Sequence, residues 1–337
     1  MSTISNDKNY FDIPVVLFTF KRYETVLRIL DRISVVKPKK IYIISDGPRT
    51  EEEKKMVKES REKIEEAITW DCEIIRNYAQ ENRGVYDRIG LGAKWVLEQE
   101  EWAIFLEDDN LPEVTFFQFC KEMLEKYKDD TRVMWICGTN YLEEYQPQDG
   151  SSYVFTQHLM PCGWASWKGK FETFYDGDMN LLENKHIVKR VEQEYSSKAL
   201  YRQQLHSVRT EYYRKQKEER YASWDFQMAF SIRANHVFGI SPCKNQIVNI
   251  GVDELSTHGG TSYSNVMTRR FCGIKSYPLS FPLKHPITVL TDPKYEKKVD
   301  KIILFPLNLR IKANIARIIK RLFGINRYEK FRLRTKK

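Results

Sequence analysis

The chain has 337 residues, 42% of them hydrophobic and 30% charged, and this composition excludes an intrinsically disordered protein. The net charge of +9 comes from one end: residues 301–337 hold 12 Lys and Arg and one acid, while the rest carry 43 basic and 45 acidic groups. A nearly neutral body argues against nucleic acid as a partner. There is no metal-type cysteine spacing, no run of 18 apolar residues and no apolar leader, so we expect a cytoplasmic protein.

The first 140 residues predict strands that alternate with helices. Apolar, β-branched runs indicate strands, and apolar side chains three and four residues apart indicate helices. Turn chemistry at Asp46–Pro48 and a capping box from Thr50 separate the second strand from its helix. The expected elements are strand 13–20, helix 23–33, strand 41–45, helix 50–69, strand 72–75, helix 86–98, strand 102–106, helix 113–127 and strand 132–137.

This alternation predicts an α/β fold with a mostly parallel sheet flanked by helices, in which ligands bind beyond the carboxyl ends of the strands. Three strand ends carry polar groups: Phe20–Arg22, Asp46 and the acidic triplet Glu107-Asp108-Asp109. Consecutive carboxylates suit a hard divalent cation, which prefers oxygen ligands. The triplet could instead be a solvated turn or the cap of helix 113–127. The agreement of three strand ends favours the metal site.

Beyond residue 140 the pattern is less regular. Residues 153–175 are rich in aromatics and glycine, 182–220 form a charged helical stretch, 222–240 read as helix then strand, and 241–280 are loop-like. We therefore expect one domain over residues 1–300. Its nucleotide-binding half covers about 13–140, and a less regular, acceptor-side half at about 141–300 closes the cleft.

The basic tail, residues 301–337, contains an amphipathic helix. Residues 307, 311, 315, 318, 319 and 322 share one face, four basic side chains group on the other, and Gly324 is a plausible stop. One interpretation is a helix packed on the domain with its basic face in water. The other is a peripheral helix on an anionic membrane surface. The neutral body favours the membrane, at the inner face of the cell membrane.

Taken in order, the motifs resemble those of GT-A glycosyltransferases of family 2-like type, and within them the N-acetylglucosaminyltransferase I branch and its bacterial relatives. The resemblance spans about residues 13–262. It rests on six motifs in the family's order: Ile13–Arg22, Ile43–Gly47, Phe105–Asp109, Pro161–Trp164, Ser223–Asp225 and Ser256–Gly260. It implies a GT-A (Rossmann-like) fold, a nucleotide-sugar donor that we expect to be a UDP-sugar, and Mn2+ or Mg2+ as cofactor.

The resemblance also implies roles on the donor side. Asp109 would ligate the metal directly, with Glu107 and Asp108 oriented toward the ribose and the surroundings of the metal. Arg22 would approach the diphosphate, and Asp46 the uracil or ribose.

Two further residues would complete the donor side. His258, in the loop that folds over the donor, would face the diphosphate, although it could be an ordinary loop histidine. Arg83 would lie near the donor, and the same ambiguity holds for Arg88. Lys21 stands where the eukaryotic branch has an Asp, so the details of the donor contacts stay open.

On the acceptor side, the resemblance implies that Asp225 is the catalytic base and that the anomeric configuration inverts. The alternative for Asp225 is a cap on the helix 226–233. Gly163 and Trp164 would offer a flat face to a sugar ring beside Trp224, although Trp164 could equally be a core aromatic.

The expected activity is transfer of a hexosyl or N-acetylhexosaminyl group to a hydroxyl of a glycan or glycolipid, in the synthesis of a bacterial surface polysaccharide. A sugar-nucleotide nucleotidyltransferase is the first rival, but it should have a Gly-rich signature after the first strand, and residues 18–22 contain no glycine. A catalytically inactive sugar- or membrane-binding protein is the second. Intact acids at positions 109 and 225 argue against it.

Overall fold

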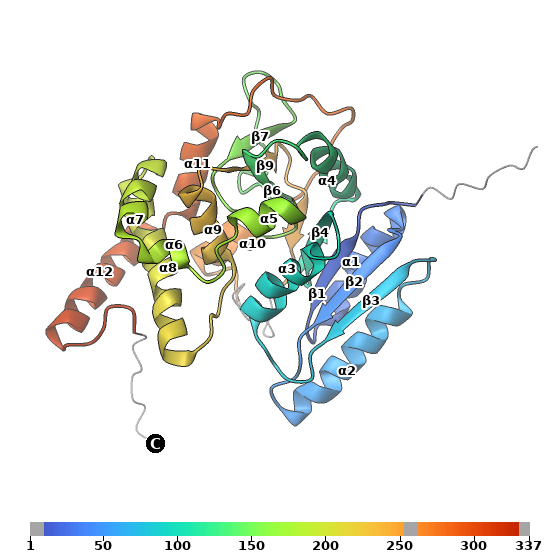
Figure 1. Cartoon of the computed structure of the whole chain (residues 1–337), viewed down its shortest axis with the longest axis horizontal. Helices are drawn as coiled ribbons and strands as arrows, with labels where there is room; N and C mark the ends of the chain where they lie inside the picture. Colours follow the sequence, from blue (N-terminus) through green and yellow to red (C-terminus); the bar gives the residue numbers. More distant parts are fainter. Residues whose placement is uncertain (1–9, 253–261, 330–337) are drawn as a thin grey trace, which may run out of the picture.

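The computed structural model describes residues 10–252 and 262–329. A central sheet runs through this part of the chain, and helices cover both of its faces (Figure 1). The predicted α/β class, with a large, mostly parallel sheet flanked by helices, is therefore confirmed.

Up to residue 137 the structure has the five predicted strands and adds the short strand β5 (Asn110–Pro112), and further short strands follow beyond that residue. The strands are β1 (Val15–Thr19), β2 (Lys40–Ser45), β3 (Glu73–Tyr78), β4 (Trp102–Glu107), β5 (Asn110–Pro112), β6 (Val133–Cys137), β7 (Tyr153–Thr156), β8 (Trp164–Trp167), β9 (Phe238–Pro242) and β10 (Ile247–Asn249).

The helices occupy the intervals between strands and most of the second half. They are α1 (Tyr23–Val36), α2 (Glu51–Glu66), the π-helix η1 (Tyr86–Leu91), α3 (Gly92–Leu97), α4 (Val114–Lys126), α5 (Lys168–Phe174), α6 (Asn180–Glu183), α7 (Lys185–Val191), the 3-10 helix η2 (Glu192–Glu194), α8 (Lys198–Glu218), α9 (Asp225–Ala234), α10 (Val266–Cys272), α11 (Pro293–Ile303) and α12 (Leu307–Leu322).

The main sheet has the order β3-β2-β1-β4-β8-β6-β9-β7. The first four strands are mutually parallel, with Thr19 opposite Ser45 and Phe18 opposite Glu107. Their carboxyl ends therefore lie at one edge, which brings the three predicted polar strand ends together. β8 runs antiparallel between β4 and β6, and β7 is an antiparallel edge strand beside β9.

The second half differs most from the sequence prediction. β7 and β8 have four residues each, all of them buried, so no alternation of polar and apolar residues marks them as strands. The charged stretch 182–220 is divided among α6, α7, η2 and α8. The side chains of Asn184 and Ser197 accept backbone N–H groups and start α7 and α8.

Two apolar cores cover the two faces of the sheet, because successive side chains of a strand point to opposite faces. Val15 and Leu17 of β1 pack with α1, α2 and α4. Val16 and Phe18 pack on the other side with η1, α3, α5, α9 and α11. The site at the strand ends therefore rests on a sheet that is packed from both sides.

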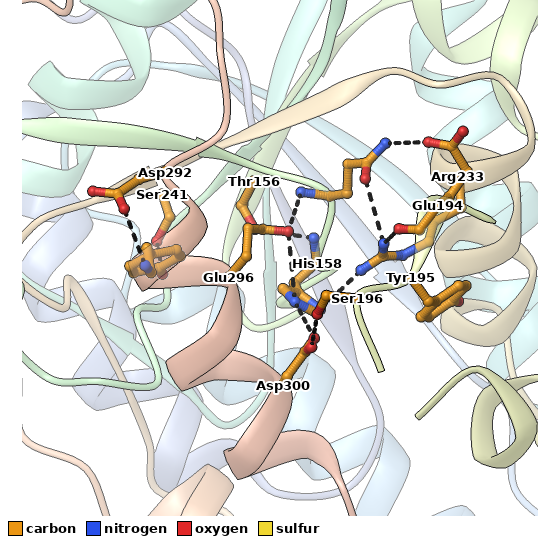
Figure 2. A network of polar contacts seen from close by, with 12 residues as sticks. Thr156, His158, Glu194, Tyr195, Ser196, Arg233, Ser241, Asp292, Glu296 and Asp300 are labelled. Carbon is orange, nitrogen blue, oxygen red and sulfur yellow. Dashed lines mark hydrogen bonds and ion pairs between the residues drawn. The ribbon is translucent and has the colours of Figure 1, made fainter. Parts of the chain in front are cut away.

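A buried polar network fixes α11 to the second half (Figure 2). His158 Nε2 lies 3.0 Å from Asp300 Oδ1, and its Nδ1 lies 3.3 Å from Arg233 Nη2. A guanidinium group only donates, so Nδ1 accepts and the proton of a neutral His158 is on Nε2, facing Asp300. Burial raises the pKa of Asp300, but hydrogen bonds from His158 and Ser196 outweigh it, and the pKa is lowered. The network joins α9, which begins with Asp225, to α11.

We expect His158→Ala to lower the free energy of unfolding by about 3 kcal/mol, because it removes one buried partner from both Asp300 and Arg233. Urea denaturation of the full chain measures this. His236→Ala is the matched control: His236 contacts Glu194 in the same region, but its side chain is 69% exposed. An exposed pair contributes at most about 1 kcal/mol. Equal losses in the two variants would contradict a stabilising role for the buried network.

Candidate functional site

A pocket lies beyond the carboxyl ends of β1, β2 and β4. Its wall contains Arg22, Asp46, Arg88 and the acidic triplet Glu107–Asp109, together with Phe18–Lys21, Ile44, Arg49, Asn82, Gly84, Val85 and Ile89. Arg22, Asp46 and the three acids of the triplet thus share one cavity, as predicted, and Arg88, which the sequence left ambiguous, lies in it too. The side chain of Arg83 is exposed and does not contribute to the wall, and His258 falls outside the described residues.

Arg22 holds the acidic triplet at the start of α1. Its Nη2 contacts Asp108 Oδ1 and lies 3.5 Å from Asp109 Oδ2, and its Nε lies 3.4 Å from Asp108 Oδ2. Arg22 occupies the position before the first residue of α1, where its own side chain caps nothing. The side chain instead turns across the strand ends from β1 to β4. Lys21, beside it, pairs with Glu53 at 2.8 Å.

The triplet carries more negative charge than Arg22 balances. Burial and the charges of Asp109, Asp108 and Asp225 raise the pKa of Glu107 well above its usual range. Burial also raises the pKa of Asp109, against the opposing effect of Arg22. Like charges in a desolvated site disfavour ionisation of each other. A divalent cation would relieve this repulsion.

The carboxylate of Asp109 is enclosed by the chain around β10. Asn110 Nδ2 donates to its Oδ1 at 2.6 Å, and the backbone N–H of Ile250 donates to its carbonyl oxygen at 2.8 Å. Gly251 lies directly on it: a Cβ atom at 251 would stand 2.4 Å from Asp109 Oδ2 and 2.9 Å from Arg22 Nη1. The approach of this segment therefore requires glycine at 251.

Asp46 organises the neighbouring loop. Its Oδ1 accepts from the backbone N–H groups of Gly47 (2.8 Å) and Arg83 (2.9 Å). Its Oδ2 accepts from Asn82 Nδ2 (2.9 Å) and the backbone N–H of Gly84 (3.0 Å). The carboxylate thereby fixes the Asn82–Gly84 turn against the end of β2, a role that the sequence prediction did not include.

Arg88 is a pocket residue that the sequence alone left ambiguous. It lies in η1 and is 8% exposed, and its Nη2 donates to the carbonyl oxygens of Ser45 and Asn77. Its Nε has no partner in the part of the chain that the structure describes, and burial lowers its pKa. A buried guanidinium with an unused donor is suited to an anionic ligand. The sequence signal for Arg88 is weak, because Asp87 and Lys94 in the same helical stretch are also charged.

Asp225 is not the cap of its helix. Trp224 occupies the capping position, and the Ser223 hydroxyl is the side chain that meets the first turn, 3.4 Å from Phe226 N. The same hydroxyl donates to Asp225 Oδ1 at 2.7 Å. Asp225 is only partly buried, and its charge acts on Glu107. The capping alternative is thus not observed, and the role of base stays a prediction.

The described residues fit a metal site that needs the substrate to complete it. In residues 10–252 and 262–329, no three Asp, Glu, His or Cys side chains are grouped so that they could hold a metal ion. Mg2+ and similar ions commonly bind through one or two carboxylates, with substrate phosphates and water as the other ligands. One desolvated carboxylate, Asp109, beside uncompensated acids fits that second arrangement.

The prediction that Trp164 and Trp224 offer a surface to the acceptor is wrong, because both rings are buried. Trp164 is 1% exposed and stacks between Phe105 (3.9 Å between ring centroids) and Trp135 (4.1 Å), with Trp224 at 5.6 Å. Neither face of Trp164 is open to a sugar. The backbone N–H of Gly163 donates to Asn110 Oδ1 at 2.7 Å, and Asn110 in turn donates to Asp109. Gly163 therefore supports the acidic triplet through Asn110.

Comparisons with known proteins give no family. No protein-family model and no curated protein sequence matches the chain. Solved structures with some similarity include S. aureus TarS (residues 1–349), with 13% identity and TM-score 0.37 over 72% of this chain and 61% of that chain. The mannosyltransferase PcManGT from Pyrobaculum calidifontis, in complex with GDP-Man and Mn2+, has 12% identity and TM-score 0.34 over 68% and 70%.

A third solved structure, 4-diphosphocytidyl-2C-methyl-D-erythritol synthase from Anaerococcus prevotii, has 12% identity and TM-score 0.32 over 52% of this chain and 78% of that chain. Such low scores carry no argument about function. The α/β class follows from the strand order and pairing of the chain itself.

We expect Trp164→Ala to lower the free energy of unfolding by about 3–5 kcal/mol, because it removes the centre of a buried aromatic stack. Urea denaturation with Leu290→Ala as the exposed control tests this, and the control should stay within about 0.5 kcal/mol of the parent. A Trp164→Ala protein as stable as the control would restore the interpretation of Trp164 as a surface platform.

Proposed function

We propose that this chain is a metal-dependent glycosyltransferase that moves a sugar from a nucleoside diphosphate sugar, expected to be a UDP-sugar, to a hydroxyl of a glycan or glycolipid. The observation that carries the proposal is the set of carboxylates at the strand ends. The charges of Asp108, Asp109 and Asp225 all act on Glu107 and raise its pKa, and Arg22 pairs with Asp108 and Asp109. A site with excess negative charge, facing a pocket with buried arginine, suits a metal-bound diphosphate.

The nucleotide side of the donor would lie along the pocket wall. Arg88 offers a buried donor group, and the Asn82–Gly84 turn is held in place by Asp46. Arg22 would exchange part of its contact with Asp108 for the diphosphate. Asp46 already accepts four hydrogen bonds, so it supports the pocket by positioning the turn, with any contact to the base or ribose added to that role.

Asp109 would hold Mn2+ or Mg2+. Such an ion, when bound, stabilises the negative charge that develops on a leaving diphosphate. Asn110 and Gly251 fix the carboxylate against the strand end. Glu107 and Asp108 supply the negative potential around it.

Asp225 would take the proton of the acceptor. In the reaction, the bond from the anomeric carbon to the phosphate oxygen breaks as a bond to the acceptor oxygen forms, and the hydroxyl proton passes to the Asp225 carboxylate. Ser223 holds one oxygen of this carboxylate at 2.7 Å and so sets its orientation. Attack from the side opposite the nucleotide would invert the anomeric configuration.

The choice of sugar and the setting rest on the sequence resemblance. It supports a hexosyl or N-acetylhexosaminyl group as the transferred sugar. It also supports a role in bacterial surface polysaccharide synthesis.

A panel of nucleotide sugars with Mn2+ tests the activity through release of free nucleoside diphosphate. We expect Asp225→Asn to lower kcat by about 10²–10⁴-fold, since a general base contributes that much, with metal-dependent UDP binding unchanged. Asp109→Ala should abolish that metal-dependent binding. If no donor releases nucleoside diphosphate, the proposed transferase activity is refuted. Release of pyrophosphate from a nucleoside triphosphate and a sugar phosphate would instead indicate a nucleotidyltransferase.

A glycine exchange tests the geometry around Asp109 without altering a charge. Gly251→Ala places a methyl group against Asp109 and Arg22, so metal-dependent UDP binding should weaken by at least about tenfold, measured by calorimetry. Gly169→Ala is the control, because a Cβ atom there meets nothing within 4 Å. Equal affinity of the two variants would show that the position of Asp109 does not govern binding.

A further inference from the structure

The helix α12 turns an apolar stripe into the solvent. Leu307, Ile311, Ile315, Ile318 and Leu322 lie on one side of the helix and are between 49% and 78% exposed. None of the residues of α12 is buried. An exposed row of this kind, unlike single surface leucines, indicates a surface that another partner covers.

The side of α12 that faces the protein is its basic side. Arg310, Ala316, Arg317 and Lys320 are the residues of α12 that are partly covered. They lie opposite the apolar stripe at 3.6 residues per turn. An amphipathic helix packed on its own domain has the reverse orientation. The alternative of a packed helix with a solvated basic face is therefore not observed.

The orientation of α12 is fixed by contacts at both of its ends. Gln203 of α8 accepts from Phe305 N at 2.8 Å and donates to Ile303 O at 2.9 Å. Arg270 Nη1 of α10 donates to Leu304 O at 3.0 Å. After the helix, the ring of Tyr328 lies 5.4 Å from that of His206. The helix lies at the edge of the molecule, next to α8 and α11 (Figure 1).

The helix α11, which precedes the linker of residues 304–306, is also held in place. Asp300 and Glu296 of α11 are both held in the buried network around His158 (Figure 2). The helix that carries the apolar stripe is thus attached to a well-packed part of the protein.

Basic side chains border the apolar stripe on its two sides. Lys312 and Arg321 are exposed and flank it, and Arg310, Arg317 and Lys320 lie further round the helix. The described residues of the tail contain one acid, Glu329. Lysine and arginine beside an apolar face can place their stems along it and their charges outward.

We propose that α12 lies in the interface of an anionic membrane, with its apolar stripe at the acyl boundary and the exposed Lys312 and Arg321, which flank the stripe, at the lipid phosphates. Charge decides between a membrane and a second copy of this chain. Two stripes packed together would bring two strongly basic helices into contact, whereas an anionic surface attracts each basic residue. A helix about 24 Å long also offers a small area against the 1,200–2,000 Å² or so of a stable protein interface.

No helix in residues 10–252 and 262–329 is long and apolar enough to cross a membrane.

The position of α12 relative to the candidate site gives this surface a use that rests on the proposed function. Arg270, which donates to Leu304 O just before α12, belongs to α10, and α10 contacts β10, the strand that leads to Gly251 beside Asp109. A transferase held this way would act on an acceptor anchored in the same lipid surface.

Sedimentation of the full chain with phosphatidylcholine vesicles, with and without phosphatidylglycerol, tests the proposal. The parent protein should sediment with the anionic vesicles. Ile311→Glu/Ile318→Glu should weaken binding by at least roughly tenfold, because burial of each isoleucine is lost. Ile287→Glu/Leu290→Glu is the matched control, with equal changes of charge and 69–96% exposure, and should bind like the parent.

Lys312→Gln/Arg321→Gln tests the electrostatic part. It should weaken binding to anionic vesicles by about tenfold or more, as expected for the loss of two surface charges. Nucleotide release in the absence of vesicles should be the same for all variants, so failure of the proposed transferase activity is scored separately.

Three results would overturn the proposal. The first is a parent protein that does not sediment with anionic vesicles. The second is equal loss of binding in the 311/318 and 287/290 variants. The third is a concentration-dependent dimer that Ile311→Glu/Ile318→Glu abolishes, without vesicle binding by the parent, which would assign the stripe to a second copy of the chain.

Discussion

The contact between Arg22 and the acidic triplet determines how the candidate site is built. A buried strand, β4, delivers three carboxylates to the edge of the sheet, where full solvation is lost. One guanidinium cannot neutralise them. Asn110 and the segment at Gly251 then close on Asp109, which keeps a charged group in a place that costs stability. This arrangement is reasonable where a cation completes the site.

The parallel half of the fold could be predicted from the sequence because each element has its own local signal. Apolar runs, helical spacing and turn residues lie within a few positions of one another from residue 13 to 137. β7 and β8 have no such signal, since both are short and buried on both faces. β8 enters the sheet between β4 and β6 through contacts that are remote in sequence.

The features of the candidate site also fall into those that the sequence predicted and those that it could not predict. Strand ends predicted which residues meet in the pocket, because parallel strands place their carboxyl ends together. They could not predict that Asp46 supports the turn 82–84, or that Ser223 takes the place of Asp225 at the helix start. Trp164 was ambiguous because a tryptophan after a Cys-Gly pair looks the same in the sequence whether it lies in a core or on a surface. The aromatic stack decides in favour of the core.

The tail shows most clearly what coordinates add to a periodic pattern. Spacing identified two faces of α12, but the direction of each face depends on Gln203 and Arg270, which bind the linker before the helix. Those contacts turn the apolar face outward. The chain has two regions of unbalanced charge, one in its nearly neutral body and one in its tail, and they have opposite sign. Negative charge is concentrated at the strand ends and positive charge along α12. Because the two regions are separate, neither cancels the charge of the other, so the first can attract a cation and the second an anionic surface.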